Sequence, residues 1–164
     1  MNRLLLLGAS LVCLVLGCSP GPDSVVFLVR HAEKVDDSRD PDLTEEGRAR
    51  ARMLAALLQD AGIEAVYSTD FIRTRETARP VAEEMEAEIE IYDDLDELVA
   101  RLEATPRTAL IVGHSNTTPQ VVALLGGEPG PPISDDEYDR LYLIVLSEGK
   151  ASATTVLRLP DPSP

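Results

Sequence analysis

Val25-Val-Phe-Leu-Val-Arg-His31 and Thr108-Ala-Leu-Ile-Val-Gly-His114 are two apolar runs that each end in a histidine. They contain the only two histidines of the 164-residue chain. Neither run alternates between polar and apolar residues, which is typical of parallel strands buried on both faces. In open α/β sheets functional groups gather at the carboxyl ends of the strands, so we expect the two imidazoles to meet in one crevice. Arg30, beside His31, indicates an anionic ligand there.

The rest of the chain alternates between strand-like apolar runs and amphipathic helical stretches. This pattern predicts an α/β fold, a three-layer sandwich with a central, mostly parallel sheet flanked by helices and ending in an antiparallel strand pair. Thr44 is expected to cap the first helix, whose first turn holds Glu45 and Glu46. Strands are expected at 25–30, 64–68, 88–92, 108–113, 141–146 and 153–159, and helices at 45–61, 74–85, 95–104 and 117–125.

Length and charge limit what the chain can be. Residues 25–159 suffice for one domain of ordinary size, and no second domain is expected. With 15 basic and 29 acidic residues the formal net charge is −14. This charge disfavours nonspecific attraction to nucleic acid, so no nucleic-acid partner is expected.

The N-terminus is typical of an export signal. One basic residue, Arg3, precedes an apolar run too short for a comfortable membrane span. Val15-Leu-Gly-Cys18 resembles the bacterial lipobox, which implies that residues 1–17 are removed and that Cys18 is lipidated. We therefore expect an envelope protein anchored to a bacterial membrane, with its domain outside the cytoplasm. An uncleaved anchor and an ordinary secretory signal are the alternatives. Residues 18–24 are expected to form a tether and residues 160–164 a disordered tail.

Three segments carry the candidate chemistry: Leu28–Lys34, Tyr67–Ala78 and Val112–Asn116. In the first two, Arg30 and Arg73 follow a strand and could clamp a phosphate through bidentate hydrogen bonds. The N-termini of the following helices add N–H donors. An imidazole is nucleophilic near neutral pH, so phosphoryl transfer to His31 would divide hydrolysis into two easier displacements.

The three segments together resemble the histidine phosphatase superfamily, which includes cofactor-dependent phosphoglycerate mutases and bacterial phosphohistidine phosphatases. The Arg-His-Gly signature of that family appears as Arg30-His31-Ala32, and its second histidine lies in Gly113-His114-Ser115. Leu43-Thr-Glu-Glu-Gly47 is similar to a recurring element at the entry to the first helix. The resemblance implies that His31 becomes phosphorylated and that Arg30, Arg73 and His114 complete the phosphate pocket. It implies no metal and no cofactor.

The proton donor is less clear from the sequence. Four carboxylates, Asp93, Asp94, Asp96 and Glu97, compete for the position that holds the donor in many relatives, and Asp94 and Glu97 are our candidates. Glu33 is a further candidate for ligand contacts. A phosphohistidine or phosphoanhydride needs less help from an acid than an alkyl phosphate does. The short interval between Arg73 and His114 leaves no room for a capping insertion, which favours hydrolysis over mutase activity.

The sequence therefore predicts a metal-independent hydrolase of phosphomonoesters, phosphohistidine or phosphoanhydrides, acting on a small phosphorylated substrate whose identity stays open. A lipid-anchored module that binds a phosphate ligand with little or no turnover is the alternative. A third interpretation makes His31 and His114 metal ligands, but Arg30 beside one of them would repel a cation. Arg75 and Arg79 are expected to form exposed ion pairs.

Overall fold

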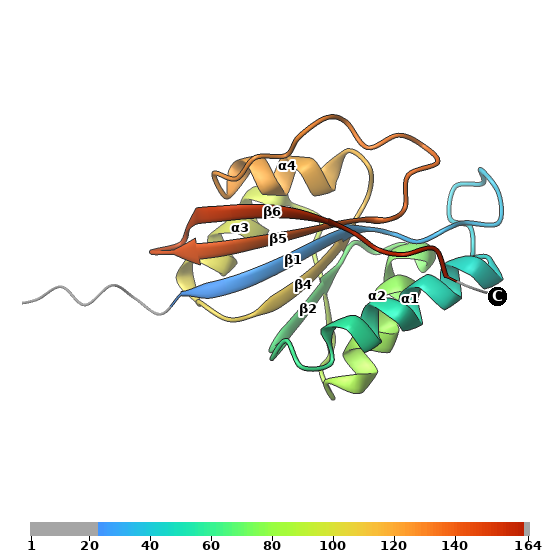
Figure 1. The fold of residues 1–164 in the computed structure, drawn as a ribbon, viewed down its shortest axis with the longest axis horizontal. Helices are drawn as coiled ribbons and strands as arrows, with labels where there is room; N and C mark the ends of the chain where they lie inside the picture. Colours follow the sequence, from blue (N-terminus) through green and yellow to red (C-terminus); the bar gives the residue numbers. More distant parts are fainter. Residues whose placement is uncertain (1–22, 163–164) are drawn as a thin grey trace, which may run out of the picture.

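The computed structural model describes residues 23–162 and consists of a six-stranded sheet between two helical layers (Figure 1). The strands are β1 (Ser24–Arg30), β2 (Ala65–Ser68), β3 (Ile89–Ile91), β4 (Ala109–Gly113), β5 (Arg140–Ser147) and β6 (Lys150–Arg158). The helices are α1 (Glu45–Leu58), α2 (Ile72–Glu84), α3 (Leu95–Ala104) and α4 (Thr117–Leu124). The strand order is β3-β2-β4-β1-β5-β6. The strands β3, β2, β4 and β1 are parallel to one another, whereas β5 is antiparallel to both of its neighbours, β1 and β6. The predicted fold class is confirmed.

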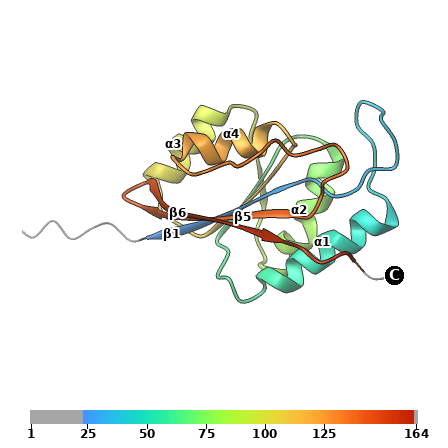
Figure 2. The same ribbon diagram turned by 45° about the horizontal axis from the view of Figure 1, so that its top comes forward.

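Both faces of the sheet are covered, α1 and α2 lying on one side and α3 and α4 on the other (Figure 2). Val26 and Leu28 of β1 belong to the core cluster that includes side chains of α3 and α4. Phe27 and Val29 belong to the cluster beneath α1 and α2. Successive side chains of a strand point to opposite faces, so a strand with two covered faces must be apolar throughout.

The starts of one helix and one strand differ from the prediction, each for a reason that the structure shows. The α2 helix begins at Ile72, two residues before the predicted start, because Oδ1 of Asp40 accepts the Ile72 N–H at 2.8 Å. The α1 helix begins as predicted, with the Thr44 side chain accepting the Gly47 N–H. The β6 strand starts at Lys150, since Glu148 and Gly149, both with positive φ, complete a tight turn.

The register between β1 and β4 aligns the two histidines. Arg30 pairs with Gly113 in this parallel ladder, so His31 and His114 are the next residues along each strand direction. The His31 N–H continues the ladder by donating to the Gly113 carbonyl at 2.9 Å. The backbone therefore brings both histidines to the carboxyl edge of the sheet.

The N-terminal predictions lie outside the described residues. The signal at 1–17, Cys18 and most of the tether belong to residues 1–22, and the last two residues, 163–164, are likewise not described. Within residues 23–162, no helix is long and apolar enough to cross a membrane. At the other end of the domain Leu159 is buried. The next residue, Pro160, is the first of the predicted tail, and its carbonyl accepts a hydrogen bond from Arg50 of α1 at 3.4 Å.

Candidate active site

A cavity of about 370 Å³ opens at the carboxyl ends of β1 and β4. It contains three of the predicted site residues, His31, His114 and Arg73. The imidazole rings of the two histidines lie edge to face with centroids 5.5 Å apart. The residues that line the cavity are His31, Lys34, Ser38, Phe71, Arg73, His114, Ser115, Asn116 and Thr117.

The His31 ring is held in one orientation by the backbone. Its Nδ1 lies 2.8 Å from the Ala32 carbonyl oxygen. Because a carbonyl can only accept, Nδ1 carries the proton and Nε2 keeps its lone pair. Burial lowers the pKa of His31 to about 3, and the positive charges of Arg30 and Arg73 act in the same direction. At neutral pH the ring is therefore uncharged, with an unprotonated Nε2.

His114 is held by side chains instead. An N–H of Arg73 points at Nδ1 over 3.4 Å, and Nε2 lies 3.0 Å from Oγ1 of Thr69. The Thr69 hydroxyl donates in turn to Thr74, whose own hydroxyl donates to backbone carbonyls. Since arginine cannot accept, this chain is consistent only with a proton on Nε2. Burial, followed by the charges of Arg73 and Arg30, lowers the pKa of His114 to about 4.

Arg73 lies in the first turn of α2, with its guanidinium beside the cavity. It approaches Oδ1 of Asp40 at 3.6 Å and lies over the Phe71 ring at 4.5 Å. Burial lowers the pKa of Arg73, and Arg30 adds to this effect, whereas Asp40 opposes it. The guanidinium is thus a partly desolvated cation that an anion in the cavity could reach.

Arg30 is not among the residues that line this cavity, in contrast to the predicted arrangement. Its Nη1 donates to the carbonyl oxygens of Ser134, Asp135 and Glu137 at 2.8, 3.0 and 3.0 Å. Its charge still lowers the pKa of both histidines, so Arg30 lies within electrostatic reach of the site.

The start of α1 packs directly against the strand end that carries His31. The Glu33 carbonyl accepts the Thr44 N–H at 2.9 Å, and a Cβ on Gly47 would overlap the same carbonyl. Only glycine allows this close approach. The sequence element 43–47 therefore supports the loop that follows His31.

The structure gives the predicted carboxylates other partners. Asp94 caps α3 by accepting the Glu97 N–H at 2.9 Å, and Glu97 pairs with Arg101 on the exposed face of that helix. Neither lines the cavity. Glu33 is bound by Arg50 at 2.6 Å, away from the cavity lining. Within residues 23–162, no cluster of His, Cys, Asp or Glu side chains could hold a metal ion.

Several residues of the site had no role assigned to them individually, although most of them lie in the segments predicted to carry the chemistry. Lys34 and Ser38 reach the cavity from the loop after β1, and Phe71 reaches it from the N-terminus of α2. Thr69 contacts His114, and its position directly after a predicted strand was the available signal. The exposed ion pairs predicted for the other arginines of α2 are present, Arg75 with Asp70 and Arg79 with Glu76.

Solved structures with the same fold include several phosphatases. The protein histidine phosphatase SixA complexed with tungstate superposes with a TM-score of 0.66 and 22% identity, over 84% of this chain and 97% of that chain. A mycobacterial glucosyl-3-phosphoglycerate phosphatase with inorganic phosphate has a TM-score of 0.65 and 14% identity, covering 86% and 100% of the two chains. For phosphoglycerate mutase from Plasmodium falciparum the TM-score is 0.59 at 16% identity, with coverage of 87% and 94%.

These identities are low enough that the superpositions show the fold alone. No curated protein sequence matches the chain significantly. Residues 26–110, more than half of the chain, match the sequence profile of the histidine phosphatase superfamily (branch 1). The matched segment runs from β1 into β4 and includes Arg30, His31 and Arg73, whereas His114 follows it. The chain belongs to the histidine phosphatase superfamily.

Proposed function

We propose that this protein is a metal-independent phosphatase that acts through a phosphohistidine on His31. The observation that carries the proposal is the pair of imidazoles, 5.5 Å apart, in a cavity that also holds the Arg73 guanidinium. The first ring offers an unprotonated Nε2, and the second is hydrogen-bonded to a cation. This combination suits nucleophilic attack on a phosphoryl group.

The reaction then has two displacements. In the first, Nε2 of His31 attacks phosphorus, the bond between phosphorus and the leaving group breaks, and the leaving group departs with the bonding pair. In the second, water attacks the phosphohistidine, releasing orthophosphate and restoring His31. The Arg73 guanidinium stabilises the charge on the phosphoryl oxygens in both steps, and His114 holds that guanidinium beside the cavity through Nδ1.

The cavity favours substrates with good leaving groups. Among the described residues that line it there is no carboxylate, and burial keeps both histidines uncharged near pH 7. A leaving group must therefore depart with little protonation by the protein. We infer that phosphohistidine, phosphoanhydrides and aryl phosphates are hydrolysed faster than alkyl phosphates.

The test is hydrolysis of an aryl phosphate by the full chain in the presence of a chelator. His31→Ala and Arg73→Ala should each abolish most turnover, whereas Arg75→Ala, which removes a partly exposed arginine of the same helix that does not line the cavity, should leave it unchanged. Acid-labile, base-stable labelling by a ³²P substrate should disappear in His31→Ala. A folded protein that binds orthophosphate but releases no product would instead favour the phosphate-binding module, and chelator-sensitive turnover would contradict the mechanism.

We also propose that the protein is anchored to a membrane through a lipid on Cys18. β1 begins at Ser24, six positions after this cysteine in the sequence, and leads to His31 at the carboxyl edge of the sheet. Seven strand residues span roughly 20 Å, so the cavity lies at the far end of β1 from the point where the chain enters the domain. Metabolic labelling with a fatty acid should mark the wild-type protein, and Cys18→Ala should be unlabelled. Labelling of both would contradict this anchor.

A further inference from the structure

The guanidinium of Arg30 is divided between two environments. Its Nη1 donates to three backbone carbonyls of one loop, those of Ser134, Asp135 and Glu137. The guanidinium carbon lies 4.3 Å from the centre of the Tyr138 ring, which belongs to the same loop. We call residues Ser134–Tyr138 the arginine-binding loop. It immobilises one nitrogen and one face of the Arg30 guanidinium.

The opposite edge of the guanidinium is left without partners. Nε of Arg30 is buried and has no hydrogen-bond partner within residues 23–162. A buried donor without a partner is costly, and its presence points to a ligand that completes it. Nε and Nη2 form the side-on edge that binds phosphate with two parallel hydrogen bonds. The loop binds Nη1 and, within residues 23–162, makes no hydrogen bond to this buried edge, which lies behind the residues that line the cavity.

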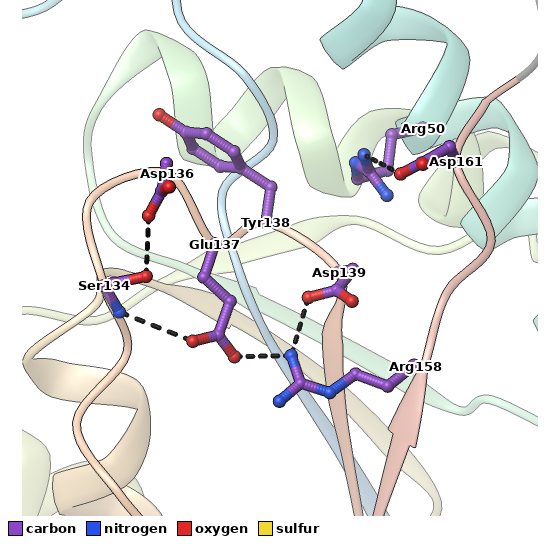
Figure 3. A pocket seen from close by; sticks show the side chains of 8 residues that line it. All are labelled: Arg50, Ser134, Asp136, Glu137, Tyr138, Asp139, Arg158 and Asp161. Atoms are coloured by element: carbon purple, nitrogen blue, oxygen red, sulfur yellow. Dashed lines mark hydrogen bonds and ion pairs between the residues drawn. The ribbon is translucent and has the colours of Figure 1, made fainter.

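The arginine-binding loop is itself held by a cluster of ion pairs (Figure 3). The Glu137 carboxylate accepts hydrogen bonds from Arg158 at 2.6 Å and from the Ser134 N–H at 3.4 Å. It also accepts two hydrogen bonds from Arg140, which the figure does not draw, at 2.6 and 2.8 Å. Burial opposes ionisation of this carboxyl, but the hydrogen bonds from Arg140 and Arg158 prevail and lower its pKa. Glu137 thus ties the loop to β5 and β6.

The Tyr138 side chain points away from the Glu137 and Arg158 side chains (Figure 3). Its ring centre lies 6.0 Å from that of His31. Tyr138 therefore lies between the ion-pair cluster and the imidazole that we propose as nucleophile, with the Arg30 guanidinium against its face.

We propose that Glu137 and Tyr138 are positioning residues that orient the side-on edge of Arg30 toward the phosphoryl group. This proposal rests on the proposed function. The three carbonyls and the aromatic face hold the guanidinium before the substrate arrives, so little ordering remains to be done on binding. The ion-pair cluster around Glu137 keeps the carbonyls in place.

The experiment measures orthophosphate affinity by calorimetry on the full chain, together with KM and kcat for an aryl phosphate. Glu137→Gln keeps the size of the side chain but weakens both arginine contacts, and the dissociation constant for orthophosphate should rise about fivefold or more. Asp139→Asn is the matched control. Its carboxylate contacts Arg158 at 2.8 Å, but its carbonyl does not bind Arg30, so its affinity should stay within about twofold.

A double-mutant cycle separates positioning from general weakening of the fold. In an Arg30→Ala background, Glu137→Gln should change phosphate affinity by less than about twofold, because the group that it positions is gone. The same loss in both backgrounds, or no loss in either, would overturn the proposal. A wild-type protein that neither binds orthophosphate nor hydrolyses the aryl phosphate would overturn the proposed function as well.

Tyr138 gives a second route that leaves the ion-pair cluster intact, should Glu137→Gln not fold. Tyr138→Phe keeps the aromatic face over Arg30 and should bind orthophosphate within about twofold of wild type. Tyr138→Leu removes that face and should bind it several times more weakly. Equal affinity of the Leu and Phe variants would contradict a positioning role for the ring.

Discussion

The arginine-binding loop and the loop after β1 hold their charged side chains in opposite ways. We call residues 34–42 the entry loop, which carries Lys34 and Ser38 to the cavity. Its ion pair joins Lys34 to Asp37, whose side chain is 98% exposed. In the arginine-binding loop Glu137 is 16% exposed and pairs with Arg140, which is 4% exposed. The entry loop follows the carboxyl end of β1, and the arginine-binding loop precedes β5, which begins at the same edge of the sheet (Figure 1).

This difference between the two loops corresponds to two parts of a substrate: the phosphoryl group, which all substrates share, and the organic part, which varies. A phosphoryl group has the same shape in all phosphorylated compounds, so the guanidinium that meets it gains from being held in place. The organic part varies, and a surface with exposed, weakly paired side chains can accommodate several shapes. We expect phosphate affinity to depend on the arginine-binding loop and substrate preference to depend on the entry loop.

The largest contrast is expected between the two cations that the loops hold. Arg30→Ala should lower kcat/KM for an aryl phosphate by about 1,000-fold, because it removes the donor pair that we propose for the phosphoryl group. Lys34→Ala should lower it by about tenfold or less, since the Lys34 ammonium is partly solvated. Steady-state kinetics on the two variants measures both values. Comparable losses would mean that the two loops share the phosphoryl group.

A smaller contrast is expected in stability. Glu137→Ala removes the carboxylate that pairs with Arg140, which is buried, and with Arg158, which is exposed. It should reduce the free energy of unfolding by roughly 2–3 kcal/mol. Asp37→Ala removes only an exposed partner and should change it by less than about 0.5 kcal/mol. Urea denaturation at neutral pH gives both numbers. Equal effects would show that burial does not distinguish the loops.

Counted per pH unit, the smallest effect concerns the pH dependence of stability. The pKa of His31 is about 3 in the folded protein, against an ordinary value of 6.5. Between these values the unfolded chain binds a proton that the folded protein does not, so stability falls as the pH is lowered through this window. The slope from one histidine is at most about 1.4 kcal/mol per pH unit. Above pH 6.5 the contribution is constant.

Replacing the two histidines separately tests this dependence. His31→Asn should flatten the stability curve between pH 6 and pH 4 relative to wild type. His114→Asn should flatten it less over the full window, because the pKa of His114 is lowered only to about 4. Urea midpoints at several pH values provide the curves. Parallel curves for all three proteins would mean that neither ring titrates differently in the folded and unfolded states.

The histidine pair was predictable because it depends on local sequence and on one general property of parallel sheets. Each strand contains an apolar run, Val25–Val29 in β1 and Ala109–Val112 in β4, and parallel neighbours end at the same edge. The start of α2 was predicted two residues late, since its first N–H is satisfied by Asp40, 32 positions earlier in the chain. No local pattern in the sequence indicates such a contact.

The hydrogen bonds of Arg30 were not predictable for the same reason. Its carbonyl partners lie 104 to 107 positions later and belong to an irregular loop with no periodic pattern. The sequence predicts Arg30 as an anion-binding residue, but which of its nitrogens lack hydrogen-bond partners depends on that distant loop. Lys34 was missed because its access to the cavity depends on the path of the entry loop.

The hydrogen bond from the His31 N–H to the Gly113 carbonyl has a consequence for how the site is lost. This bond extends the ladder between the two central parallel strands, whose residues are almost entirely buried. The amide hydrogen of His31 can exchange with solvent only when β1 separates from β4, which requires opening of the whole core. The two imidazoles should therefore keep their spacing until the domain itself unfolds, even when the surrounding loops open first.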